Sequence, residues 1–173
     1  DSPEWDCIEH GLYDQPVMKQ VNKRLKIFFG APGTFKTTNA IAELDDKSNI
    51  IVCSASTDAT DLMFDFDFDK DGKPTFKPSK LYLAAEQGKA FVLDEINLLN
   101  DDVLRFLQGI TDNKEEFSIK GRTVKVKEGF MIIGTMNLSV NSRIYPLPEA
   151  LVDRCLEIRE FKLDASMLEG SLD

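Results

Sequence analysis

Histidine and cysteine are scarce in this sequence of 173 residues, which has one histidine, three cysteines and one tryptophan. Because His10 is the only histidine, a zinc site built from histidine and cysteine is nearly excluded. Cys7, Cys53 and Cys155 are odd in number, widely spaced and form no C-x-x-C pair. The simplest interpretation is buried free thiols, since Cys53 and Cys155 lie within apolar, strand-like runs.

Long apolar segments are also missing. No stretch approaches the ~18 apolar residues of a membrane-spanning helix, and the N-terminus lacks the basic-then-apolar pattern of a secretion signal. A cytoplasmic location without a membrane partner is therefore expected. The 21 basic residues are outnumbered by 30 acidic ones, and the net charge of -9 argues against a broad surface for duplex nucleic acid. The length suits a single domain with a sizeable core.

A strand, a turn and a helix-compatible stretch near the N-terminus carry the strongest functional signal. The apolar run 26–29 leads into the spacing of a phosphate-binding loop, G-x-x-x-x-G-K-[ST]. Gly30, Lys36 and Thr37 fit this pattern, but Phe35 replaces the glycine expected before the lysine. The residues expected to contact the nucleotide are Gly30, Ala31, Pro32, Gly33, Thr34, Phe35, Lys36, Thr37 and Thr38.

The chemistry of such a loop explains its composition. Successive backbone N–H groups that open onto a helix form an anion cradle. Lys36 would reach the β- and γ-phosphates, and the Thr37 hydroxyl would bind Mg²⁺. The plainer alternative is a strand-to-helix turn that contains a lysine by chance.

A second segment supports the phosphate-binding interpretation. The apolar run 90–93 ends in two adjacent carboxylates, Asp94 and Glu95. A carboxylate at a strand end beside the loop can hold the Mg²⁺ shell, which suits Asp94. Glu95 is then placed to orient or deprotonate a water molecule that attacks the γ-phosphate. The alternative is a solvated strand exit with acidic residues before a helix.

Apolar runs alternate with helix-compatible stretches along the chain, which indicates a buried parallel sheet with helices on both faces. Residues 1–16 are turn-rich, and residues 17–24 have a mild helical pattern. After the run 26–29, strands are expected at 49–53, 89–93, 130–135 and 155–159. Helices are expected at 37–44, 79–87, 101–110 and 147–154.

Two hairpins are expected as insertions into this alternation. In residues 64–69 phenylalanine alternates with aspartate, and a turn at 70–73 lets residues 75–77 return. The phenylalanine stripe is interpreted as core packing in preference to a recognition surface. The spacing D-x-D-x-D-G at Asp67 resembles a calcium loop, but Pro78 stands where a glutamate is needed, so a solvated acidic face is preferred. The second hairpin, 116–127, has a basic outer face.

Taken together, these segments resemble an AAA+ ATPase of the dynein-related and MoxR-type branch, which includes CbbQ- and NorQ-like proteins. The resemblance covers residues 17–160. Its motifs are the phosphate-binding loop (Walker A), the acidic strand end (Walker B) and a strand, 134–137, that ends at Asn137. It implies that Asn137 is a sensor that positions the attacking water or touches the γ-phosphate. It also implies that Arg154, in the segment 147–154, is an arginine finger for the neighbouring subunit. Asn137 as a strand-end cap and Arg154 as a surface or helix-capping arginine stay open. Arg143 is a weaker candidate for the finger.

The resemblance implies an α/β P-loop NTPase core at 17–160, between an irregular lead-in at 1–16 and a tail at 161–173. Too few residues follow Arg154 for the small helical lid, which is either truncated or naturally absent, so low activity of the isolated core is expected. The implied function is Mg²⁺-dependent ATP hydrolysis by a homo-oligomeric ring, expected to be a hexamer, that remodels a protein or nucleoprotein client. The alternatives are a degenerate nucleotide-dependent scaffold with little hydrolysis and a GTP-using motor of the same branch.

Overall fold

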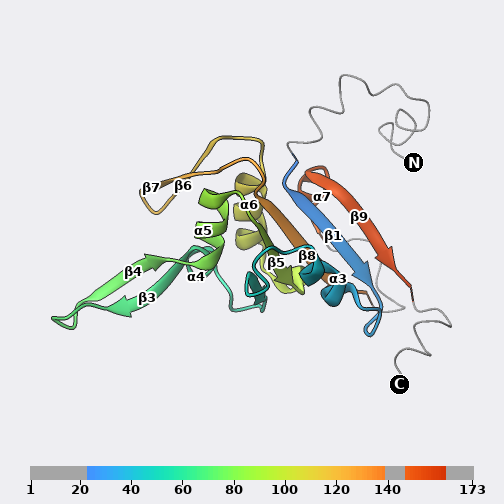
Figure 1. Cartoon of the computed structure of the whole chain (residues 1–173), viewed down its shortest axis with the longest axis horizontal. Helices are drawn as coiled ribbons and strands as arrows, with labels where there is room; N and C mark the ends of the chain where they lie inside the picture. The colour runs from blue at the N-terminus through green and yellow to red at the C-terminus, as the bar shows by residue number, and fades with distance from the viewer. Residues whose placement is uncertain (1–22, 139–146, 163–173) are drawn as a thin grey trace.

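A five-stranded parallel sheet forms the centre of the computed structural model, which describes residues 23–138 and 147–162. The strand order is β2-β5-β8-β1-β9, and every neighbouring pair runs parallel (Figure 1). The strands are β1 (Leu25–Gly30), β2 (Ile50–Val52), β5 (Ala90–Asp94), β8 (Met131–Asn137) and β9 (Cys155–Phe161). The predicted five-stranded parallel sheet is confirmed.

Helices cover both faces of this sheet, because the apolar strands bury side chains in both directions. On one face Phe28 and Ile133 pack with Ala40 of the first helix, and on the other Ile27 belongs to the larger core cluster. The helices are α3 (Lys36–Ala42), α4 (Ala59–Met63), α5 (Lys80–Gln87), the 3-10 helix η1 (Ile96–Leu98), α6 (Asp101–Ile110) and α7 (Glu149–Val152). The prediction of two covered faces is confirmed.

Capping side chains set where several of these helices begin. Asp58, Ser79 and Asn100 each accept a hydrogen bond from the backbone N–H three residues later, ahead of α4, α5 and α6. The expected helix 147–154 is shorter, since Leu147 precedes a proline and is disfavoured in helical conformation. The predicted helical pattern at 17–24 lies mostly outside the described residues, as does Arg143.

Both predicted hairpins are present as two-stranded sheets. The first consists of β3 (Phe64–Phe68) and β4 (Pro74–Pro78), and the second of β6 (Glu116–Ile119) and β7 (Arg122–Lys125). In Figure 1 both extend from the same end of the molecule, and β3–β4 reaches farthest from the parallel sheet.

The interpretation of the phenylalanine stripe as core packing is wrong for two of its three residues. Phe64 is buried, but Phe66 and Phe68 are 56% and 61% exposed. The hairpin extends beyond the helices, so none of the described elements covers its outer half. The acidic face is solvated as predicted, and Asp67 forms an ion pair with Lys77 at 2.7 Å.

Two predictions from the scarce residue types can be compared with the structure. Cys53 is a buried free thiol, and Cys155 is a partly buried free thiol, whereas Cys7 lies outside the described residues. Within the described ranges, no helix is both long enough and apolar enough to cross a membrane.

Candidate functional site

The phosphate-loop segment connects β1 to α3 and is closed on itself by hydrogen bonds to one carbonyl. The Ala31 oxygen accepts from Thr34 Oγ1 at 2.7 Å and from Lys36 Nζ at 3.1 Å. Thr34 and Lys36 are buried, whereas Ala31, Pro32 and Gly33 are exposed. The Lys36 ammonium group therefore lies inside the loop, while the turn before it faces solvent.

Gly30 ends β1 where no other residue fits. A Cβ atom built there would lie 2.2 Å from the carbonyl oxygen of Phe161 on the neighbouring strand β9. The Gly30 carbonyl in turn accepts a hydrogen bond from the Leu138 N–H at 3.0 Å. The start of the loop is thus held between the ends of β8 and β9.

Phe35 adopts the left-handed conformation that a glycine would adopt without cost. Its torsions are φ 61° and ψ 21°, and its side chain is 42% exposed. This conformation strains the backbone of a residue with a Cβ atom by about 1–2 kcal/mol. The Phe35 carbonyl accepts from the backbone N–H and from the side-chain amide of Asn39, at 2.9 and 2.8 Å.

Asp94 connects the phosphate loop to the middle of the sheet. Its Oδ1 atom accepts a hydrogen bond from Thr37 Oγ1 at 2.9 Å, and the Thr135 hydroxyl donates to the same oxygen. Thr37 lies in the first turn of α3, Asp94 ends β5, and Thr135 lies in β8. Because the C-terminal ends of parallel strands lie on the same side of a sheet, segments far apart in sequence meet here.

Glu95 leaves the strand in a left-handed conformation, with φ 56° and ψ 49°. Its N–H donates to Thr135 Oγ1 at 3.0 Å, and its Oε1 atom accepts from Asn137 Nδ2 at 3.1 Å. The backbone and the carboxylate of Glu95 are therefore both held by β8. The structure thus brings Asn137, the predicted sensor, into contact with the carboxylate of Glu95, the predicted base.

Sequence reasoning assigned no role to Thr135, although its hydroxyl joins the two carboxylate residues. It donates to Asp94 and accepts from the N–H of Glu95, and the residue is only 1% exposed. The available signal was a hydroxyl in an otherwise apolar strand, because a buried polar group needs a partner.

Lys36 lies close enough to the carboxylates to be affected by their charge. Burial lowers the pKa of Lys36 below its ordinary value, and the negative charges of Asp94 and Glu95 partly oppose this. A desolvated ammonium group gains from an added anionic partner. This environment suits a ligand with phosphate charge.

The donor set around Asp94 fits Mg²⁺, which prefers oxygen ligands and keeps several that the protein does not supply. The Thr37 hydroxyl and the Asp94 carboxylate could supply two oxygen ligands, and they lie within one hydrogen bond of each other. In the described part of the chain, no group of three or more histidine, cysteine, aspartate or glutamate side chains could hold a metal. A bound Mg²⁺ would therefore depend on phosphate and water oxygens for its other ligands.

Arg154 lies near the N-terminal ends of the sheet strands, whereas the phosphate loop of its own chain lies at their C-terminal ends. It precedes β9, whose first residue Cys155 pairs with Leu25 at the start of β1, whereas the loop follows the end of β1. Arg154 Nη1 donates to the Ala150 carbonyl at 2.6 Å, and Nη2 lies 3.9 Å from Asp112 Oδ1. The structure does not bring Arg154 together with the other predicted site residues.

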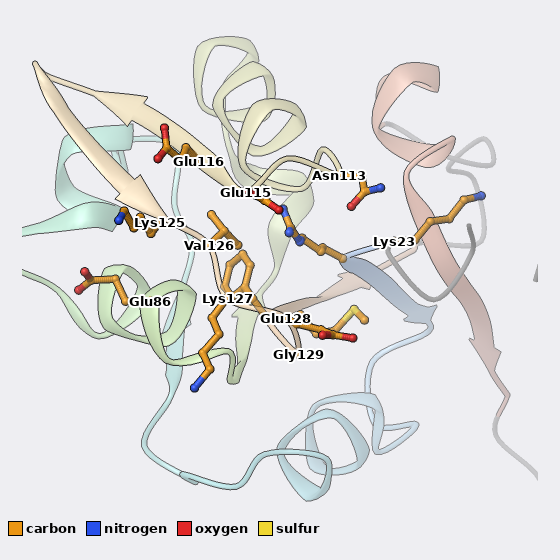
Figure 2. Close-up of a pocket in the computed structure, with 13 residues that line it drawn as sticks. Lys23, Glu86, Asn113, Glu115, Glu116, Lys125, Val126, Lys127, Glu128 and Gly129 are labelled. Carbon is orange, nitrogen blue, oxygen red and sulfur yellow. The ribbon is translucent and has the colours of Figure 1, made fainter. Parts of the chain in front are cut away.

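A hollow of about 770 Å³ lies near the N-terminal ends of the strands, away from the phosphate loop. Figure 2 shows Lys23, Glu116 and Lys127 among the side chains around it, so charges of both signs line it. Arg24 also lines it, and its Nη1 atom donates to the carbonyls of Asp112 and Lys114, both at 2.7 Å. This arrangement favours no particular ligand.

Comparisons with known proteins agree with this geometry. Residues 26–155 match the model of the family described as AAA domain (dynein-related subfamily). Midasin from Giardia intestinalis is 31% identical over 135 residues, which cover 75% of this chain but only 3% of Midasin. A solved structure from Cytophaga hutchinsonii, which carries a provisional ATPase assignment, superimposes with a TM-score of 0.64 and 20% identity.

That superposition covers 95% of this chain and 49% of the other, and at this identity it shows the fold alone. The chain thus spans about half of the solved relative and a small fraction of Midasin. The resemblance inferred from the loop, the acidic strand end and the following strand is confirmed by the family match. The chain belongs to the AAA domain family, in its dynein-related subfamily.

Proposed function

We propose that this chain is the ATP-binding and ATP-hydrolysing core of an oligomeric AAA+ protein. The observation that carries the proposal is the hydrogen bond between Thr37 and Asp94, with the Glu95–Asn137 pair on the adjacent residues. A hydroxyl, a carboxylate and a second carboxylate held by an amide are the groups that a phosphoryl-transfer site requires. In this chain they come from three separate segments.

Phosphate binding would depend on the loop and on Lys36. In the free protein the ammonium group donates to the Ala31 carbonyl, which is a weak partner for a buried charge. The β- and γ-phosphates of ATP would replace this carbonyl with a charged acceptor. Mg²⁺, held by Thr37 and Asp94, would neutralise part of the phosphate charge when bound.

Hydrolysis would use Glu95 as the group that orients a water molecule and takes its proton. The water oxygen forms the new bond to the γ-phosphorus, the bond to the β-phosphate oxygen breaks, and ADP leaves with that electron pair. Asn137 contacts the same carboxylate and would hold it, or the water, in line with that bond.

Completion of the site by a neighbouring subunit is a further part of the proposal. Arg154 lies at the opposite end of the strands from the loop of its own chain, which favours action in trans. Its partner Asp112 would keep the guanidinium in place until the neighbour's phosphate is bound. A ring, expected to be a hexamer, would use this cycle to remodel a protein or nucleoprotein client.

The test is Mg²⁺-ATP turnover by the full-length protein. Glu95→Gln is expected to bind ATP normally and to lose at least ~100-fold in turnover, because general-base catalysis contributes about 10²–10⁴-fold. Glu86→Gln, which changes an exposed carboxylate on α5, is the matched control and should turn over ATP as the wild type does. Equal turnover in wild type and Glu95→Gln would overturn the assignment of the base.

A second candidate is a nucleotide-dependent scaffold with little hydrolysis, and Phe35 is the observation that favours it. A bulky, left-handed residue in the loop reduces the adaptability that turnover needs. In that case ATP would promote assembly, and wild type and Glu95→Gln would assemble equally. GTP is the third alternative, and comparing ATP with GTP in the same assay separates the two.

A further inference from the structure

One face of the β3–β4 hairpin is entirely apolar. Side chains alternate between the faces of a strand, and the cross-strand pairs place phenylalanines opposite prolines or each other. The pairs Phe64–Pro78, Phe66–Phe76 and Phe68–Pro74 make up this surface, which we call the aromatic face. The other face carries Asp65 and Asp67, opposite Lys77 and Thr75.

Most of the aromatic face is open to solvent. Phe66, Phe68 and Phe76 are 56%, 61% and 48% exposed. The centre of the Phe66 ring lies 5.0 Å from that of Phe68 and 5.6 Å from that of Phe76, and both pairs are edge-on. A contiguous exposed aromatic cluster on a projecting element marks an interaction surface far more often than an isolated apolar residue does (Figure 1).

The inner end of the aromatic face leads into a pocket of about 380 Å³ between the two hairpins. Phe64 and Phe76 line it from β3–β4, and Lys120 and Arg122 line it from the second hairpin. The Arg122 guanidinium lies over the Phe64 ring, 5.3 Å from its centre. In the described part of the chain, neither Lys120 nor Arg122 takes part in an ion pair.

These charges determine which kind of molecule fits. The two cations beside an apolar surface complement a carboxylate that adjoins an aromatic or aliphatic side chain. A nucleic acid would also stack on phenylalanine, but its phosphates would run past Asp65 and Asp67 on the same narrow hairpin. Repulsion from these carboxylates, in a chain of net charge -9, disfavours that ligand.

We propose that the aromatic face and the adjoining pocket bind an extended polypeptide segment of a partner protein. Apolar side chains of this segment pack on Phe66, Phe68 and Phe76, and an acidic residue enters the pocket between Lys120 and Arg122. The inference rests on the client part of the proposed function and specifies where the client binds. Neither hairpin contributes a residue to the phosphate site, so hydrolysis can be tested separately.

The test uses two short fluorescein-labelled peptides and measures anisotropy with the full-length protein. One peptide carries phenylalanines followed by aspartates, and in the other the aspartates are lysines. The acidic peptide is expected to bind at least ~10-fold more tightly, a difference of ~1.4 kcal/mol. Phe68→Ser should weaken its binding by at least ~10-fold, since an aromatic anchor of a docking surface is lost. Leu156→Ser, at an apolar residue on β9 that is 38% exposed, is the control and should bind normally.

A charge swap then tests the pocket itself. Arg122→Glu should weaken the acidic peptide and strengthen the basic one, whereas Lys70→Glu at the hairpin turn should change neither. Equal binding of both peptides, or a Phe68→Ser variant that binds normally, would overturn the proposal. So would tighter binding of a single-stranded oligothymidine, or a Phe68→Ser variant that changes only the oligomeric state. Turnover without peptide should be the same in wild type, Phe68→Ser and Leu156→Ser. If all three lack turnover, the proposed ATP hydrolysis fails, and the proposed peptide binding is unaffected.

Discussion

Asn137 holds the carboxylate of Glu95 by a hydrogen bond from Nδ2 to Oε1 at 3.1 Å. Asn137 ends β8, and Glu95 directly follows the neighbouring strand β5, so the bond lies at the C-terminal ends of the strands, where the phosphate loop also lies. We expect Asn137→Ala to lower turnover ~10–100-fold with little change in ATP affinity, because the base loses its orientation and the phosphate contacts remain. Steady-state kinetics and calorimetry measure the two effects.

The matched control for this prediction is Asn113→Ala, which removes an exposed amide far from the loop. It should leave both quantities unchanged. If Asn137→Ala weakens ATP binding as much as it weakens turnover, Asn137 contacts the nucleotide directly in addition to Glu95.

Thr135→Val should impair turnover although Thr135 would not touch the substrate. The substitution keeps the shape but removes the hydroxyl that donates to Asp94 and accepts from the Glu95 N–H. Loss of these buried hydrogen bonds should cost about 1–3 kcal/mol of unfolding free energy. Thr111→Val removes another buried hydroxyl, bonded to the Leu107 carbonyl, and should destabilise the fold without slowing turnover. Thr135→Ser should restore turnover, and equal kinetic effects of both valine variants would contradict a positioning role.

Nucleotide binding should take up protons at alkaline pH. Burial holds the pKa of Lys36 below its ordinary value in the free protein, so the ammonium begins to deprotonate at a lower pH than an exposed lysine. Bound phosphates favour the charged form and raise this pKa, hence ATP affinity should fall as the pH rises through the lowered value. Calorimetry in buffers of different ionisation enthalpy measures the uptake. Lys36→Arg keeps its charge throughout and should show none, whereas uptake that persists in Lys36→Arg would assign it to another group.

Phe35→Gly should tighten ATP binding. The left-handed torsions of Phe35 strain the loop, and glycine adopts them freely. Relief of ~1.4 kcal/mol would tighten binding up to about tenfold if the bound loop requires torsions that strain Phe35 more than those of the free loop. Phe35→Leu retains a Cβ atom and the strain, so it serves as the control and should bind as the wild type does. A clear loss of affinity in Phe35→Gly would show that the ring contributes to the site.

Hydrolysis should require assembly, because Arg154 and the phosphate loop lie at opposite ends of β1, which spans about 20 Å. Arg154→Ala should be nearly inactive alone, as should Glu95→Gln. Mixing the two should restore part of the turnover, since some interfaces then combine an intact base with an intact finger. Arg105→Ala, at an exposed arginine on α6, should remain active without mixing. Activity that does not depend on protein concentration, with no rescue, would contradict a role for Arg154 in trans.

Local patterns predicted much of this molecule because they concern near neighbours in sequence. The spacing from Gly30 to Thr37 indicated the loop, and adjacent carboxylates after an apolar run indicated the acidic strand end. Alternation of period two in residues 64–69 indicated the first hairpin. Each of these signals depends on backbone geometry over a few residues, which is why each is confirmed.

The contacts between segments could not be predicted in the same way. No pattern indicated that Thr135 joins Asp94 to Glu95, because that bond requires the register of β8 against β5. The interpretation of Phe66 and Phe68 as core residues failed for a related reason. Periodicity shows that a strand has an apolar face, but only the position of the surrounding helices decides whether that face is covered.

The sequence by itself therefore determined the family, the succession of the sheet strands and of most helices along the chain, and the residue types that we expect to face a phosphate. The tertiary structure decided that Asn137 holds Glu95, that Arg154 lies far from its own loop and that an aromatic surface is exposed. The physical reason is that backbone propensity and spacing act over a few residues. Hydrogen bonds between strands and burial depend on which distant segments the sheet brings together.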